Sequence, residues 1–231
     1  MTARYAVFFA PEWQSPWHSF GSHWLGRDEH HNSKLVQPKM AEIDAATFAS
    51  LTQEPRRYGF HATLKAPFRL VHGVNEQALM VQLGTLARTL KPILLSPLGV
   101  AAPGNFLALV PTTISDDQGA IAAACVTHLD DLRAPLSKAE LARRHATPLD
   151  SREMQLLDQY GYPYVLERFR LHFTLTGPAE PALIQRVANA VAPQLAQLNA
   201  DVPLWLDRLC LFVERAPGNM FHRIHDEALL P

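Results

Sequence analysis

Two stretches of sequence decide the architecture: RYGFHATLK at residues 57–65 and RFRLHFTLT at residues 168–176. Each contains an aromatic residue or leucine, followed by histidine, any residue, threonine and leucine. Side chains alternate between the two faces of a strand, so residues two apart share a face. One face of each stretch is then apolar, and the other presents histidine and threonine beside basic side chains. We therefore predict two strands, within 57–66 and 168–176, that each pack on a core and carry a polar His-x-Thr face.

The remaining sequence alternates between short strand patterns and amphipathic helical patterns. It predicts strands at 4–9, 93–100, 106–111, 204–214 and 220–225, and helices at 40–53, 74–90, 118–132, 148–157 and 181–195. Ser137 and Glu140 fit a capping box, and Thr147-Pro148 fits the start of the following helix. Residues 12–38 show no clear period and are expected to form loop with at most a short helix. Since no linker or low-complexity segment is evident, we expect one α+β domain over 1–231.

Composition and charge exclude several classes of protein. The chain has 231 residues, 48% of them hydrophobic, and a formal net charge of -1. This balance argues against wholesale disorder and against a protein that binds extended nucleic acid. No stretch approaches the ~18 apolar residues of a membrane span, and the first residues lack the features of a signal peptide. Cys125 and Cys210 lie in apolar segments and are expected to be reduced core residues, so we expect a cytoplasmic protein.

The paired motifs suit proton transfer at phosphorus. One of His61 and His172 can accept a proton from an attacking water or hydroxyl while the other donates one to the departing oxygen. Thr63 and Thr174 can hydrogen-bond the non-bridging oxygens as charge grows in the transition state. Nearby basic side chains and one aromatic residue are weaker candidates for contacts with the phosphate or a base; these are Lys65, Arg57, Arg170 and Tyr5. The chemistry requires no metal and no other cofactor.

With these motifs the chain resembles the 2H phosphoesterase superfamily, which carries paired His-x-Ser/Thr strands about a hundred residues apart. The strings WLGRD (24–28), RYGFHATLKAPF (57–68), FLALVP (106–111) and YGYPYVLERFRLHFTLTG (160–177) resemble its branch associated with phosphonate-utilisation operons. The resemblance implies a bilobed, pseudo-symmetric duplication in which each lobe contributes an antiparallel sheet with flanking helices to a central cleft. It also implies metal-independent attack on a cyclic phosphodiester, with His61 and His172 as acid and base and Thr63 and Thr174 binding the phosphate.

The other histidines have simpler explanations. His145-Ala146-Thr147 repeats the His-x-Thr string, but Pro148 follows it and Thr147 fits a helix cap, although the basic run 143–145 could approach an anionic substrate. Four histidines within residues 12–38, together with Asp28 and Glu29, could suggest a metal site, but their spacing matches no zinc pattern. These histidines are His18, His23, His30 and His31. His222 and His225 are expected on opposite faces of the last strand.

We expect a cyclic phosphodiesterase acting on a small phosphorylated sugar or nucleotide, possible substrates including ribose 1,2-cyclic phosphate and 2′,3′-cyclic nucleotides. Two alternatives stay open. The first is the processing or 2′-5′ ligation of RNA ends by the same residues, which overall neutrality disfavours. The second is a module that binds a phosphorylated metabolite without turnover, which the intact His and Thr residues of both motifs disfavour. The oligomeric state cannot be inferred from the sequence.

Overall fold

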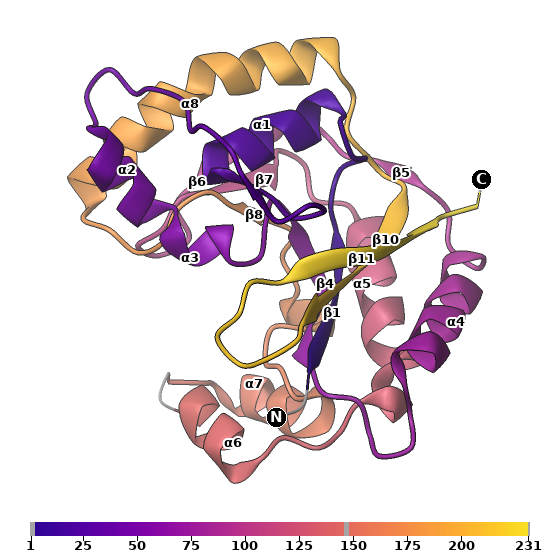
Figure 1. The fold of residues 1–231 in the computed structure, drawn as a ribbon. Helices are drawn as coiled ribbons and strands as arrows, with labels where there is room; N and C mark the ends of the chain where they lie inside the picture. Colours follow the sequence, from indigo (N-terminus) through magenta and orange to yellow (C-terminus); the bar gives the residue numbers. More distant parts are fainter. Residues whose placement is uncertain (1–2, 146–147, 231) are drawn as a thin grey trace.

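The computed structural model describes residues 3–145 and 148–230 and is built on one antiparallel sheet of seven strands (Figure 1). The order across the sheet is β11-β10-β1-β4-β8-β7-β6. The strands are β1 (Arg4–Phe9), β4 (Ala62–Phe68), β6 (Leu98–Ala101), β7 (Ala108–Pro111), β8 (Phe173–Thr174), β10 (Arg208–Glu214) and β11 (His222–Ala228). Two ribbons of two strands lie outside this sheet: β2 (Arg27–Asp28) with β3 (Ser33–Lys34), and β5 (Ile93–Leu94) with β9 (Trp205–Leu206).

The sheet joins segments from both ends of the chain. The hairpin β10–β11 pairs with β1, so that Tyr5 lies opposite Val213. The two motif strands β4 and β8 are neighbours, with Ala62 opposite Phe173. The expectation of a separate sheet in each lobe is therefore corrected: both motifs belong to one continuous sheet. An α+β architecture with antiparallel strands and flanking helices is confirmed.

Four of the helices with eight or more residues share one core with one face of the sheet. They are α1 (Pro16–Leu25), α4 (Glu76–Ala87), α5 (Asp116–His128) and α8 (Pro181–Asp201). Alternate residues of β1, among them Tyr5 and Phe9, lie in this core, whereas Phe8 lies in a small cluster on the other face. Since amphipathic helices bury their apolar sides against one face, the opposite face of the sheet is left with less cover. In the described part of the chain, no helix has the length and apolarity needed to cross a membrane.

Several element boundaries differ from the sequence predictions. Residues 12–38 contain the ten-residue helix α1, capped by Ser15. The capping box of Ser137 and Glu140 is confirmed before α6 (Lys138–His145), whereas α7 (Ser151–Tyr160) begins three residues later than predicted because Asp150 supplies its cap. The proposed cap at Thr147, and Ala146 of the third His-x-Thr string, lie outside the described residues. The short elements are α2 (Ala45–Leu51), α3 (Gln53–Arg56), η1 (Asp130–Leu132) and η2 (Leu166–Arg168).

Two glycines on helices test the packing of the core. A Cβ atom on Gly21 of α1 would lie 1.9 Å from Cγ of the buried Phe60, whereas one on Gly119 of α5 would meet nothing within 4 Å. We expect Gly21→Ala to lower the free energy of unfolding by about 1–3 kcal/mol, because the added methyl overpacks the core. Gly119→Ala should raise it by up to about 1 kcal/mol through helix propensity. Urea unfolding of both variants checks this, and equal stabilities would contradict the packing of α1 on Phe60.

Candidate functional site

His61 lies immediately before β4 and points to the less covered face of the sheet. Its ring stacks on Phe8 with 3.9 Å between ring centroids. The Nδ1 atom is 2.9 Å from the carbonyl oxygen of Gly59, which can only accept, so Nδ1 carries the hydrogen. In the neutral ring, Nε2 then holds the lone pair and is 3.3 Å from the hydroxyl of Thr63. This arrangement leaves Nε2 available to take up a proton.

His172 lies immediately before β8 and repeats this arrangement. Its Nδ1 atom is 2.8 Å from the carbonyl oxygen of Arg170, again two residues earlier in the chain. The pairing of Ala62 with Phe173 is antiparallel, so one step along each strand places residue 61 opposite 174 and residue 63 opposite 172. The two motifs are therefore related by a local twofold axis, side by side on neighbouring strands rather than across a cleft from one another.

A cavity of about 330 Å³ opens beside these strands. Its wall includes His61, Thr63 and Thr174, and His172 stands beside it with its ring 6.3 Å from that of Phe106, a wall residue. The other residues of the wall are Arg4, Phe8, Glu54, Pro55, Tyr58, Ala66, Pro67, Phe106, Arg144, Tyr162, Thr176, Gly177 and Pro178. Aromatic rings, hydroxyls and two guanidinium groups thus surround a space of the size that a small phosphorylated molecule requires.

The environment of His61 keeps its imidazole uncharged. Burial of the ring lowers the pKa of His61 to about 4, and a positive charge on His172 lowers it further. The Gly59 carbonyl and the carboxylate of Glu29 act in the opposite direction. A neutral imidazole with a free Nε2 is the form that a general base requires.

Four weaker candidates from the sequence lie outside the wall of this cavity. Lys65 is buried, and its Nζ donates to the Val126 carbonyl and approaches Asp130, because irregular pairing of β1 with β4 breaks the simple alternation of faces. Tyr5 lies in the main core. Arg57 pairs with Glu214 and donates to the Asn219 carbonyl, and Arg170 donates to the carbonyls of Glu167 and Phe169. None of the four belongs to the cavity wall, and a contact between any of them and phosphate stays a prediction.

The structure also adds residues that the motifs did not indicate. Arg4 and Phe8 share a face of β1, and Arg4 pairs with Glu214 at one side of the cavity. Phe106 comes from the segment before β7, and the guanidinium of Arg144 lies 4.9 Å from the ring centroid of Tyr162. Two-residue periodicity could have grouped Arg4 with Phe8, and Arg144 belongs to the basic run 143–145 that the sequence indicated could approach an anionic substrate.

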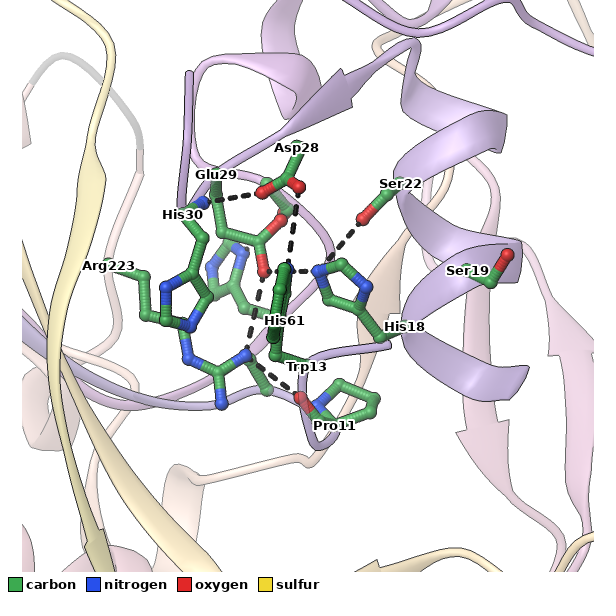
Figure 2. Close-up of polar contacts among 12 residues, drawn as sticks. Pro11, Trp13, His18, Ser19, Ser22, Asp28, Glu29, His30, His61 and Arg223 are labelled. Carbon is green, nitrogen blue, oxygen red and sulfur yellow. Dashed lines mark hydrogen bonds and ion pairs between the residues drawn. The ribbon is translucent and has the colours of Figure 1, made fainter. Parts of the chain in front are cut away.

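The histidine-rich segment forms an ion-pair network beside the site (Figure 2). His18, Asp28 and Glu29 offer ligand atoms within 4.8 Å of one another, which is the grouping a metal ion could use. Glu29 is fully buried, and its Oε1 lies 3.3 Å from His18 Nε2 and 3.6 Å from Nη1 of Arg223. The guanidinium of Arg223 already supplies a positive charge next to Oε1 of Glu29, the oxygen to which a metal cation would bind. These residues therefore fit an ion pair better than a metal site. His18 lies in a helix and is buried, which corrects its assignment to a loop.

The lowered pKa of His61 predicts a pH dependence of stability. Between about pH 6.5 and pH 4 the unfolded chain binds a proton that the folded chain does not, so the free energy of unfolding falls as pH decreases. Between pH 7 and pH 5 this contribution is at most about 2 kcal/mol. The His61→Gln variant, which lacks the titrating ring, should lose correspondingly less stability over this range. Urea unfolding at both pH values measures the difference, and parallel losses would contradict the burial of a neutral His61.

Comparison with known proteins places the chain in a family. It is similar to two proteins named ribose 1,5-bisphosphate phosphokinase PhnN, one from Janthinobacterium sp. (strain Marseille) at 41% identity over 221 residues, and one from Laribacter hongkongensis (strain HLHK9) at 36% over 219 residues. Each alignment covers 94% of this chain but only 49% and 50% of the relatives, so the chain spans about half their length. Residues 63–222 match the family model described as protein of unknown function (DUF1045), and the chain therefore belongs to the DUF1045 family.

Proposed function

We propose that this chain is a metal-independent cyclic phosphodiesterase of the 2H type, acting on a small phosphorylated sugar or nucleotide. The observation that carries the proposal is the matched pair of histidines immediately before neighbouring strands, each with Nδ1 held by a carbonyl two residues earlier and a threonine two residues later. The local twofold relation of the motifs supports descent from a duplication. Names of the relatives, which refer to a ribose bisphosphate and carry the Phn prefix, support a role in phosphonate catabolism.

The geometry supports a hydrolysis with two proton transfers. Neutral His61 accepts a proton at Nε2 from water as the water oxygen bonds to phosphorus. The bond from phosphorus to one ring oxygen breaks, and His172 in its protonated form donates a proton to that oxygen. The product is a phosphomonoester with a free hydroxyl, and the protons balance after the histidines exchange one with solvent. In this proposal Thr63 and Thr174, which both line the cavity, donate hydrogen bonds to the non-bridging oxygens.

A kinase reaction is the second candidate, because the relatives are named phosphokinases. The P-loop of many kinases reads Gly-x4-Gly-Lys-Ser/Thr, a string that does not occur in the 231 residues of this sequence. Since the chain spans about half of each relative, we assign the kinase activity of those relatives to their other half.

A panel of substrates separates these functions. Ribose 1,2-cyclic phosphate and 2′,3′-cyclic nucleotides are incubated with and without EDTA, and ribose 1,5-bisphosphate is incubated with ATP and Mg²⁺. The proposal expects hydrolysis of a cyclic phosphate that EDTA does not abolish. Phosphorylation of the bisphosphate without any hydrolysis would support the kinase, tight binding without turnover would support a non-catalytic module, and cleavage or ligation of RNA ends alone would support RNA processing.

The two histidines should carry most of the rate. His61→Ala and His172→Ala should each lower kcat by ~10²–10⁴-fold, because each removes one proton-transfer group. Circular dichroism of each variant checks that the fold is kept. A folded double variant with full activity would refute the assignment of both residues.

Arg144 should contribute to substrate binding rather than to chemistry. Its guanidinium lies in the cavity wall over Tyr162, where it can pair with an anionic group of the substrate. Because a hydrogen bond to a charged group contributes about 1.5–3 kcal/mol, Arg144→Gln should raise KM by about tenfold or more and change kcat little. Arg143→Gln is the matched control, since Arg143 is exposed and outside the wall. Equal KM values for the two variants would contradict this role.

A further inference from the structure

We propose that Arg27 is a positioning residue for His61: by binding the backbone of the preceding loop, it holds the Gly59 carbonyl that orients the imidazole. The catalytic consequence rests on the proposed function, whereas the orientation of His61 does not. Arg27 lies in β2, outside the seven-stranded sheet, and it does not belong to the cavity wall.

The guanidinium of Arg27 is buried, and its bonds go to backbone carbonyls and an amide rather than to a carboxylate. Nη1 donates to the carbonyls of Arg56 at 3.0 Å and Arg57 at 3.2 Å, and Nη2 donates to the carbonyl of Phe221. Nε donates to Oδ1 of Asn32 at 2.9 Å. One side chain, 3% exposed, thus joins the last residue of α3 and the loop that leads to His61 to Phe221, the residue before β11.

The far end of this loop is closely confined. Gly59 has φ +84°, a conformation that favours glycine, and a Cβ atom there would lie 2.8 Å from Cβ of Glu29. Glu29 is in turn fully buried and contacts His18 and Arg223 (Figure 2). The backbone N–H of Arg223 donates to the Glu29 carbonyl, and that of Phe221 donates to the Arg57 carbonyl. The loop therefore has residues 27–29 on one side and residues 221–223 on the other.

This confinement determines which nitrogen of His61 is free. As long as the Gly59 carbonyl remains 2.9 Å from Nδ1, the hydrogen stays on Nδ1 and the lone pair on Nε2. If the loop shifts, this bond weakens and the ring can exchange its hydrogen between the two nitrogens or rotate away from Thr63. Lysine cannot replace the contacts of Arg27, because one ammonium group lacks the planar set of donors that reaches three carbonyls together.

The experiment compares Arg27→Lys with Arg208→Lys. Arg208 is a matched control because its partners are the carboxylates of Glu12, Asp207 and Asp226, which a lysine can still approach. Long-range ¹H–¹⁵N spectra at pH 7 report the tautomer of His61 directly. We expect hydrogen on Nδ1 in the wild-type protein and in Arg208→Lys, and a mixture of tautomers in Arg27→Lys.

Kinetics on the cyclic phosphate that the wild-type protein hydrolyses provide the second measurement. Arg27→Lys should lower kcat by about 10–100-fold with little change in KM, since loss of an outer contact misplaces a catalytic group without removing it. Folded Arg27→Lys with an unchanged tautomer and unchanged kcat would overturn the proposal. If no cyclic phosphate is hydrolysed, the proposed function fails, but the tautomer measurement still tests the positioning.

A milder variant covers the case in which Arg27→Lys does not fold. Asn32 is exposed, has φ +53°, and contributes only the acceptor for Arg27 Nε to this network. Asn32→Gly keeps that backbone conformation available and removes the acceptor. We expect a smaller shift of the His61 tautomer in the same direction, whereas spectra identical to those of the wild-type protein would count against the role of Arg27.

Discussion

The arrangement of the site depends on the antiparallel pairing of β4 with β8, in which Ala62 lies opposite Phe173. This pairing joins the four strands on the β1 side to the three on the β7 side. On the core face the junction is held by the stacked rings of Phe60 and Phe173, whose centroids are 4.9 Å apart. On the other face it places His61 and His172 in related positions, each immediately before one of the two neighbouring strands. The same contact therefore stabilises the sheet and assembles the candidate catalytic pair.

One-sided packing explains why that second face is available. Helices α1, α4, α5 and α8 contribute to a single large core on one side of the sheet. On the opposite side, a smaller apolar cluster of described residues surrounds Phe8, Phe212 and Phe221. His61 stacks on Phe8 within this cluster, so an apolar contact both buries its ring and disfavours its charge. The packing that positions His61 thus also keeps its imidazole neutral, the form that the proposed role as proton acceptor requires.

The distribution of charge leaves a small positive excess beside the cavity of a nearly neutral chain. Glu214 is shared by Arg4 and Arg57, so one carboxylate faces two guanidinium groups. Arg144 adds a further cation to the wall, which also includes Glu54. This excess lies beside a cavity of about 330 Å³, which agrees with the proposed compact phosphorylated substrate better than with a polymer whose binding depends on many phosphate contacts.

Part of the site could be read from local pattern. His61, Thr63, His172 and Thr174 follow from a motif that occurs twice with strand periodicity, and the structure brings the two copies together. Strand alternation predicts Lys65 on the same face as His61, but the structure places it on the other face. Irregular pairing of β1 with β4 changes the face on which a side chain emerges, and such irregularity has no local signature. The side chain of Tyr5 could lie on either face of its strand, and only the packing of the helices shows that it faces the core.

The sequence by itself determined the type of most elements, the near-neutral net charge and the identity of the paired motifs. All three depend on composition or on residues close together in the chain. Only the tertiary structure decided that the motifs share one sheet, that Arg4, Phe106 and Arg144 join the cavity wall, and that Arg27 binds the loop before His61. These contacts link residues distant in sequence, and their partners are backbone carbonyls or aromatic faces that almost any sequence can supply. For that reason no residue pattern specifies them before the chain has folded.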